Sequence, residues 1–349
     1  MTRTGTSPST PTTPAPGRRP GERPRTAFVF SGQGSEWPGM ASRLLDASLV
    51  FREHFLDCAD AVARHAGWSP EDVLRGMPGS PHLARVEVVQ PVLFCVNTAL
   101  AELWTAHGTR PDAVVGQSQG EVAAACLAGA LSRDEAAGLL VARARLLAAE
   151  LGGRGGIAAV ALGAPEVRRR LLRHPGLTVA GDIGPRQATV AGPSAPLERF
   201  VAELRAEGVR ARVVAGTVPS HGPAVEPLRD RLIAQAAHLR PRRARLPLYS
   251  TVTGGRIEGT ELTGRYWYEN ARRPVLLAPV VRRLVRAGVR GFVEPSPHPL
   301  LTAPVEEAAR AAGAGPGTAV TGTLRRGRGD VATFLRAFAE FRGYRSGGS

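Results

Sequence analysis

One short segment constrains the fold more than any other part of the sequence. Ala113 to Val115 is a β-prone apolar run, Gly116-Gln117-Ser118-Gln119-Gly120 is a glycine-bounded turn, and Glu121 to Ala125 strongly favours a helix. A strand that enters a helix through such a turn presents a serine at the top of a sheet. We therefore expect an α/β fold with Ser118 exposed at the turn.

This arrangement suits a nucleophile, because a serine hydroxyl needs exposure, a nearby base and donors for the oxyanion that forms on attack. The new helix points backbone N–H groups at that charge. Gly116 and Gly120 are expected where backbones pass close on both sides. The candidate bases are His221, in a proline-punctuated loop, and its rival His298. Four other histidines have the surroundings of solvated surface: His54, His65, His107 and His174.

The charge balance narrows the classes of partner. The 349 residues include 45 basic and 30 acidic side chains, a formal charge of +15, and every basic residue is arginine. Clusters at 240–243 and 325–328 could face phosphorylated molecules or an acidic protein. We predict no nucleic-acid partner, because zinc-finger spacing and interleaved basic and aromatic residues are both lacking.

Cysteine usage and hydropathy indicate the compartment. Cys58, Cys95 and Cys126 are far apart and odd in number, which predicts buried thiols without a disulfide or a metal site. We expect a cytoplasmic protein. No apolar run reaches the roughly 18 residues of a membrane span, and the start lacks a secretory apolar core.

The chain divides into four parts. Residues 1–25 are rich in Pro, Ser and Thr and are expected to be a disordered arm. Residues 26–154 and 218–342 should form a large α/β subdomain, and the pattern βαββαβ over 155–217 predicts a small inserted one. Residues 343–349 are expected to be a flexible tail.

Several separated motifs resemble the malonyl-type acyltransferase family of fatty-acid and polyketide synthesis, over about residues 26 to 340. They are Phe28 to Gly34 with Trp37 and Met40, Gln90-Pro91, Gly116 to Glu121, Arg143-Ala144-Arg145, Ser220-His221, Tyr249 to Gly254, Tyr266-Trp267 and Glu294 to Pro299. The resemblance implies an α/β-hydrolase-like large subdomain with a ferredoxin-like insert. It also implies transfer of an acyl group from acyl-CoA, through Ser118, to the phosphopantetheine thiol of an acyl carrier protein.

The resemblance assigns roles to individual residues. His221 would be the general base, oriented by a backbone carbonyl of the segment 249–253. The backbone N–H groups of Gln33 and Gln119 would form the oxyanion hole. Arg143 would pair with the free carboxylate of a malonyl-type substrate, a task for its planar donor fork. Acidic carrier proteins and polyketide synthase modules are the implied partners, and neither a cofactor nor a metal ion is expected.

The substrate site departs from the family pattern. Gln117 stands where the family has histidine, Ile183 replaces an asparagine, and Val218-Pro219-Ser220-His221 matches neither common form of its motif. Four residues are expected in the substrate site beside Arg143: Gln90, Gln117, Val218 and Ser220. Gln119 and Ser220 favour an α-substituted malonyl group such as methylmalonyl or a larger alkylmalonyl unit.

Other functions remain open on the sequence. The acyl group could move between two carriers or to a hydroxyl of a finished product. The same fold could hydrolyse wrongly loaded thioesters, or the domain could serve mainly as a docking module of a synthase.

Overall fold

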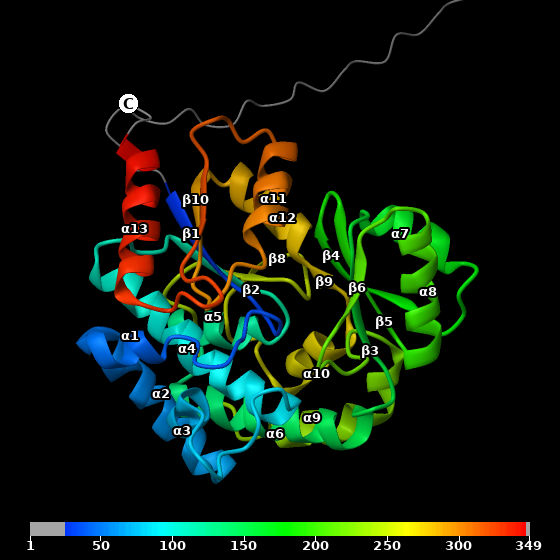
Figure 1. The fold of residues 1–349 in the computed structure, drawn as a ribbon, viewed down its shortest axis with the longest axis horizontal. Helices are drawn as coiled ribbons and strands as arrows, with labels where there is room; N and C mark the ends of the chain where they lie inside the picture. Colours follow the sequence, from blue (N-terminus) through cyan, green and yellow to red (C-terminus); the bar gives the residue numbers. More distant parts are fainter. Residues whose placement is uncertain (1–24, 347–349) are drawn as a thin grey trace, which may run out of the picture.

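The computed structural model describes residues 25–346, which form two β-sheets and the helices around them (Figure 1). The strands are β1 (Arg25–Phe30), β2 (Ala113–Gly116), β3 (Gly156–Val160), β4 (Thr178–Gly184), β5 (Gln187–Gly192), β6 (Ala211–Val214), β7 (Leu248–Ser250), β8 (Gly255–Ile257), β9 (Val275–Leu276), β10 (Val289–Glu294) and β11 (Ala319–Gly322). The helices are α1 (Ser42–Ala47), α2 (Leu49–Ala66), α3 (Pro70–Arg75), α4 (Val86–Ala106), α5 (Gly120–Leu127), α6 (Arg133–Leu151), α7 (Ala164–Leu171), α8 (Ser194–Ala206), the 3-10 helix η1 (Pro223–Leu228), α9 (Arg229–Gln235), α10 (Gly264–Arg272), α11 (Leu277–Arg286), α12 (Thr302–Ala311) and α13 (Val331–Ser346).

The larger sheet has the strand order β11-β10-β1-β2-β7-β8. Its strands are parallel from β11 to β7, and β8 returns antiparallel to β7. Because side chains alternate along a strand, β1 supplies both faces of the sheet. Phe28 and Phe30 pack with α2, α4 and α13, whereas Ala27 and Val29 pack with α11 and α12. Helices therefore cover both faces of this sheet, as the predicted α/β-hydrolase-like class requires.

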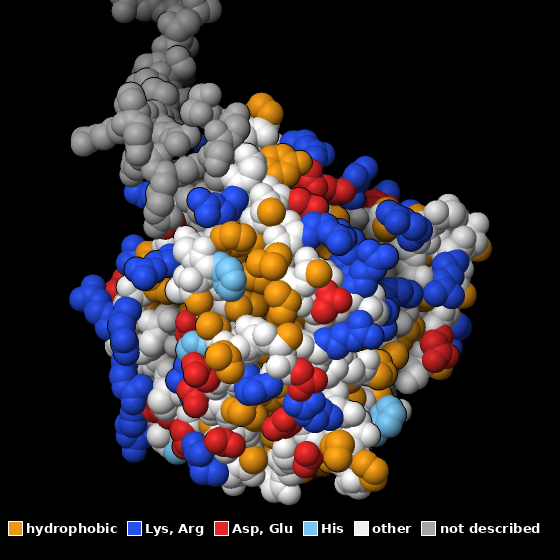
Figure 2. Space-filling view, turned by 60° about the vertical axis from the view of Figure 1, so that its left-hand side comes forward, with side chains coloured by type: hydrophobic (Ala, Val, Ile, Leu, Met, Phe, Trp, Pro, Cys, Tyr) orange, Lys and Arg blue, Asp and Glu red, His pale blue; other side chains and the backbone are white. Residues whose placement is uncertain are grey.

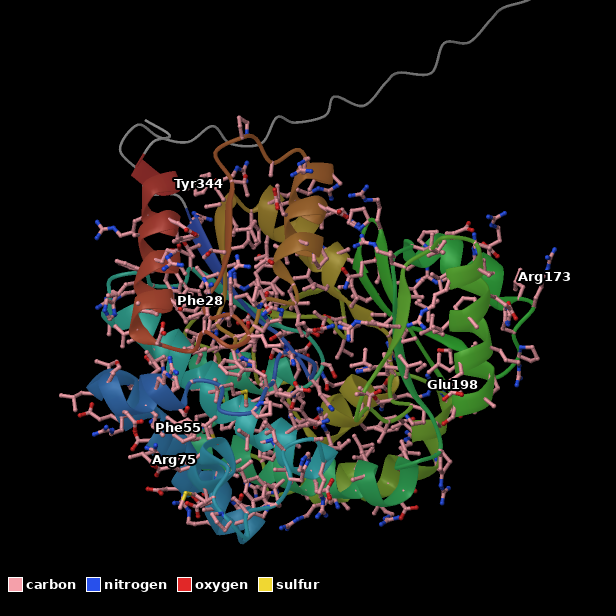
Figure 3. The ribbon with its side chains drawn as sticks, viewed as in Figure 1. Phe28, Phe55, Arg75, Arg173, Glu198 and Tyr344 are labelled. Atoms are coloured by element: carbon pink, nitrogen blue, oxygen red, sulfur yellow. The ribbon has the colours of Figure 1, made fainter. Side chains whose placement is uncertain are left out.

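The smaller sheet has the order β6-β3-β5-β4-β9 and, with α7 and α8 packed on it, forms the lobe at the right of Figure 1. Its first four strands and two helices follow the predicted βαββαβ order. The fifth strand, β9, comes from the chain after the insert and pairs in parallel with β4. The boundary predicted at 217 therefore omits one strand of the small sheet. Figure 3 shows Arg173 and Glu198 on the outer side of this lobe, and Phe28 and Phe55 inside the large one.

Helix α4 lies at the centre of the large subdomain. By length and hydropathy it could cross a membrane, contrary to the prediction that no run is apolar enough, but 89% of its apolar window is buried inside the protein. Within residues 25–346 it is the single helix that meets this test. Its apolar surface is covered by α2 and α6 and needs no lipid.

The arm predicted at 1–25 and the tail predicted at 343–349 both overlap regular structure. Arg25 already belongs to β1, where it aligns with Val289 of β10. The tail predicted at 343–349 is helical as far as Ser346, because α13 continues past Gly343. The rest of the predicted arm, residues 1–24, and residues 347–349 lie outside the described residues.

Candidate active site

The turn between β2 and α5 holds Ser118 in a left-handed conformation, with φ at 56°. Strain of this kind at a non-glycine residue persists only where the surroundings fix it, and it gathers at functional sites. The flanking glycines are sterically required. A Cβ on Gly116 would lie 2.1 Å from the backbone nitrogen of Glu121, and one on Gly120 would lie 2.3 Å from the carbonyl oxygen of Phe30. The sequence thus forces the elbow and leaves Ser118 half-buried at its tip.

His221 is the histidine that meets Ser118. Its Nε2 lies 2.8 Å from Ser118 Oγ, and its own φ is also left-handed, at 60°. The backbone N–H of His221 donates to the carbonyl of Ala271, and its Nδ1 lies 2.9 Å from the carbonyl oxygen of Arg273. The prediction that segment 249–253 orients the ring was therefore wrong, since residues just after α10 do so.

The hydrogen bonds of His221 define its protonation state. A carbonyl oxygen only accepts, so Nδ1 carries the proton and Nε2 presents a lone pair to the hydroxyl of Ser118. Burial lowers the pKa of His221 to about 4, the hydrogen bond to the Arg273 carbonyl opposes that shift, and the charge of Arg143 adds to it. The ring is thus neutral at pH 7 and able to accept a proton.

A pocket of about 410 Å³ opens above this pair, between the two subdomains. Its walls come from the loop after β1, from β3 and β5 of the small sheet, from the His221 loop and from residues 298–301. The lining includes seven residues that the sequence predicted for the site besides Ser118: Gln33, Gln90, Gln117, Gln119, Val218, Ser220 and His221. The rival base His298 also lines the pocket, but its Nδ1 accepts from the backbone N–H of Arg326.

Two loops face the elbow with free backbone donors. Within residues 25–346, the N–H groups of Gln33 and Gln119 have no hydrogen-bond partner. Gln119 is the N-cap of α5, where the helix dipole favours negative charge. The side chain of Gln33 donates to the carbonyl of Gly216 at 2.9 Å, and that of Gln117 accepts from Gly32 N–H at 3.3 Å. These side-chain bonds fix the loops that carry the two donors.

Arg143 lies close to the elbow but outside the pocket lining. It is 3% exposed, and its Nη1 donates to Oδ1 of Asn270 at 2.7 Å. Asn270 in turn donates from Nδ2 to the carbonyl oxygen of Ser118 at 3.1 Å. Burial lowers the pKa of Arg143 to about 10, which the charge of Glu121 opposes, so the guanidinium stays protonated at pH 7. A buried cation with a neutral partner therefore lies close to Ser118.

Two buried carboxylates brace the site. Glu121, at the start of α5, accepts from the backbone N–H of Thr251 at 2.6 Å and from the hydroxyls of Thr251 and Tyr266. Glu294, at the end of β10, accepts from the backbone N–H groups of Leu300 to Thr302. Burial raises the pKa of Glu294 to about 7. Glu294 thereby fixes the segment 298–301 that lines the pocket.

Sequence reasoning missed Asn270 and the Arg273 carbonyl. A buried asparagine on an otherwise amphipathic helix gives no recognisable pattern, and a backbone carbonyl has no signature in the sequence at all. Ile183, which replaces an expected asparagine, is 1% exposed and packs with Val275 and Leu301. Within residues 25–346, no group of three or more His, Cys, Asp or Glu side chains could hold a metal ion.

Comparisons with known proteins give one consistent result. Residues 27–344 match the family model described as the acyl transferase domain. The chain is 47% identical over 331 residues to the spectinabilin polyketide synthase system protein NorA' of Streptomyces orinoci, covering 94% of this chain and 9% of that protein. It is 46% identical over 313 residues to the erythronolide synthase EryA2 of Saccharopolyspora erythraea, covering 89% and 9%.

Solved structures agree in fold. The acyltransferase domain from module 8 of the salinomycin polyketide synthase shares 45% identity with a TM-score of 0.87, over 92% of this chain and 75% of that one. A loading acyltransferase from the avermectin modular polyketide synthase shares 41% identity with the same TM-score, over 91% and 100%. The chain spans only a small part of the length of its curated relatives: 6% of the polyketide synthase GfsB of Streptomyces halstedii and 20% of the pikromycin polyketide synthase component PikAIII of Streptomyces venezuelae.

Proposed function

The chain belongs to the acyl transferase domain family, an enzyme family, and from this premise we propose that it transfers a malonyl-type acyl group from CoA to the phosphopantetheine thiol of an acyl carrier protein. The observation that carries the proposal is the hydrogen-bond distance of 2.8 Å between Ser118 Oγ and Nε2 of a neutral His221, at the floor of a pocket. Methylmalonyl or another alkylmalonyl unit is the proposed acyl group.

The first half-reaction acylates Ser118. As Oγ bonds to the thioester carbon, its proton passes to His221 Nε2 and the carbonyl electron pair moves onto oxygen. That oxyanion is received by the free N–H groups of Gln33 and Gln119. Collapse of the intermediate breaks the C–S bond, and the departing thiolate takes the proton from His221.

The second half-reaction repeats these steps in reverse order. A carrier thiol gives its proton to His221 and attacks the acyl-Ser118 ester, and Ser118 leaves with the proton returned. The carbonyl of Arg273 holds the imidazolium that forms in each half-reaction. The steps use only groups of this chain and the two thiols, so the proposal includes no cofactor or metal.

Arg143 supports a carboxylated acyl group. It is the buried cation beside the nucleophile, and its Nε is buried with no hydrogen-bond partner within residues 25–346. A substrate carboxylate would accept a hydrogen bond from this unused Nε–H, at the short distance that charge-assisted hydrogen bonds favour. Since Arg143 does not line the pocket as it stands, the carboxylate must displace neighbouring side chains to reach it. An alkyl branch would lie against Gln117, Val218 and Ser220 in the pocket wall.

A groove beside the pocket supports CoA and an acidic carrier as partners. It has a volume of about 1050 Å³ and runs between β6 and α12. Ala159, Gln187 and Arg212 line both the groove and the pocket. Its arginines are Arg186, which pairs with the one acid of the groove, Glu307, and Arg205, Arg210 and Arg212. Figure 2 shows that basic side chains are unevenly spread over the face in view, with a dense group toward its upper right.

Two arginines of the cluster at 240–243 already form ion pairs within the protein. Arg242 pairs with Glu135, and Arg243 pairs with Glu258. The groove, where Arg210 and Arg212 form no ion pair within residues 25–346, is therefore a better candidate than this cluster for phosphates and acidic side chains. Cys58, Cys95 and Cys126 are free thiols in the structure, in keeping with the cytoplasmic location that we propose.

A donor panel tests the proposal. The protein is incubated with acetyl-, propionyl-, malonyl-, methylmalonyl- and ethylmalonyl-CoA, and CoA release is followed with and without a phosphopantetheinylated carrier protein. We expect methylmalonyl- or ethylmalonyl-CoA to react at least tenfold faster than acetyl-CoA, and the acyl group to appear on the carrier. Fast CoA release without carrier loading would identify a hydrolase instead.

A second candidate is the loading of a simple acyl starter. It is favoured by the 41% identity with the avermectin synthase's loading acyltransferase. Acetyl- and propionyl-CoA in the panel decide this point, because a starter-loading enzyme would prefer them over every carboxylated donor.

A further inference from the structure

Asn270 stands between the two buried charges of the active site and touches neither pocket nor solvent. It lies on α10, is 2% exposed, and bonds to Arg143 with its oxygen and to the Ser118 carbonyl with its nitrogen. We propose that Asn270 is a positioning residue that keeps Arg143 from pairing with Glu121, so that the Arg143 charge remains available to a substrate carboxylate. The inference rests on the proposed function, because it concerns the recognition of a carboxylated acyl group.

The pairing of Arg143 is unusual for a buried cation. A buried charge is costly unless it is paired, and the common partner of a buried guanidinium is a carboxylate. Here the one hydrogen bond that the Arg143 side chain makes within residues 25–346 goes to a neutral amide. The acid whose charge acts on Arg143 is Glu121, and the two do not form an ion pair.

Glu121 is held by other groups. Its carboxylate accepts from the backbone N–H and the hydroxyl of Thr251 and from the hydroxyl of Tyr266. Hydrogen bonding from Asn270 joins these in opposing the rise in the pKa of Glu121 that burial causes. The acid is thus satisfied by neutral donors on α10 and in the turn after β7, and it need not approach Arg143.

An amide suits this position because its two ends differ. The oxygen accepts from the cation, while the NH₂ group donates to the Ser118 carbonyl and lowers the pKa of the nearby Glu121 carboxyl. An aspartate could accept from Arg143 but could donate to neither of the others. It would also provide a permanent anion within reach of the guanidinium, which would compete with the carboxylate of the substrate.

The test compares Asn270→Asp and Asn270→Ala with the unaltered protein. The readout is the ratio of kcat/KM for methylmalonyl-CoA to kcat/KM for propionyl-CoA, which differ by one carboxylate. We expect Asn270→Asp to lower this ratio at least tenfold and Asn270→Ala to lower it by a smaller factor. Loss of the hydrogen bond from Asn270 to the Ser118 carbonyl should lower kcat/KM for both donors by the same factor, so by itself it leaves the ratio unchanged.

Two controls separate positioning from general damage. Thr323→Val removes two other buried hydrogen bonds, the one from Trp104 and the one to the carbonyl oxygen of Glu294, and is expected to leave the ratio unchanged. In an Arg143→Ala background, either change at Asn270 should have no further effect on the ratio, because Asn270 acts through Arg143. Thermal unfolding of each variant confirms that it is folded.

Three results have distinct meanings. A ratio that Asn270→Asp and Asn270→Ala both leave unchanged would overturn the role of Asn270 while leaving the proposed function intact. A full effect of Asn270→Asp in the Arg143→Ala background would also overturn it. An unaltered protein that uses propionyl-CoA as well as methylmalonyl-CoA would overturn the proposed carboxylated substrate, and this inference with it.

Discussion

The two walls of the pocket are built in opposite ways. On the large subdomain, Ser118 and His221 line the pocket, and Arg143, Asn270 and Glu121 lie behind them. These five residues are joined by hydrogen bonds, and all but the half-buried Ser118 are buried. On the small subdomain, the adjoining groove is open, and its Arg210 and Arg212 are exposed.

The difference suits what each wall would do in the proposed reaction. Acyl transfer needs donors and acceptors that are fixed before the reaction, in a site from which water is largely excluded. Reception of a charged donor or carrier needs charge that solvent and salt can reach. Substitutions in the first wall, on the large subdomain, should therefore change the acylation rate and the free energy of unfolding. Substitutions in the second wall, on the small subdomain, should change KM at low salt.

The largest effect is expected at the base. His221→Ala removes the proposed acceptor of the Ser118 proton, so the rate of Ser118 acylation should fall about 10³-fold or more. Stopped-flow measurement of CoA release gives this rate. His298→Ala is the matched control, because His298 lines the same pocket without contacting Ser118. If His298→Ala caused the greater loss, the assignment of the base would be reversed.

The next effect concerns the folding of the first wall. Gly120→Ala places a Cβ 2.3 Å from a carbonyl oxygen of the backbone, which cannot move aside as a side chain could. We expect the free energy of unfolding to fall by about 3 kcal/mol, as for a strained, overpacked core site. Gly317→Ala, which meets nothing within 4 Å, should be nearly neutral. Equal stability of the two variants in urea unfolding would show that the elbow is not rigid.

The burial of His221 in the first wall also determines how the acylation rate depends on pH. His221 acts as a base only when neutral, and its pKa is lowered to about 4. The acylation rate at pH 5.5 should therefore stay within about twofold of that at pH 7.5, whereas a histidine of ordinary pKa, about 6.5, would lose about tenfold. Glu294, with a pKa raised to about 7, titrates in this range, so the profile is repeated in Glu294→Gln. A tenfold loss in both proteins would contradict the burial of His221.

The smallest effect is expected on the second wall. Replacing Arg210 and Arg212 together with serine should raise KM for acyl-CoA about three- to tenfold at low salt, and the effect should shrink at 0.5 M salt. Stability should not change, because both side chains are exposed and neither forms an ion pair within residues 25–346. Arg243→Ser removes a charge elsewhere and should leave KM unchanged. A KM effect independent of salt would count against a charged groove.

The sequence predicted the parts of this enzyme that depend on local pattern. The strand, turn and helix around Ser118 follow from three adjacent segments, and the α/β-hydrolase-like fold with its ferredoxin-like insert is confirmed. The motif order also indicated that Ser118 and His221 would meet, and the structure brings them within hydrogen-bond distance.

The parts that the sequence did not predict depend on contacts between distant backbone groups. Strand β9 joins the small sheet although it lies some 60 residues beyond the insert's last strand, and nothing in its two residues indicates that partner. The Arg273 carbonyl orients His221 through an atom that every residue has. The role of Asn270 depends on two charges that reach it from α5 and α6, and a sequence does not show which buried groups meet.

The central claim is that Ser118 carries the acyl group, and peptide mass mapping after reaction with methylmalonyl-CoA tests it most directly. The account predicts one acyl mass on the peptide that contains Ser118, and none on that peptide in Ser118→Ala. An adduct that survives in Ser118→Ala, or that maps to another residue of the unaltered protein, would contradict the account.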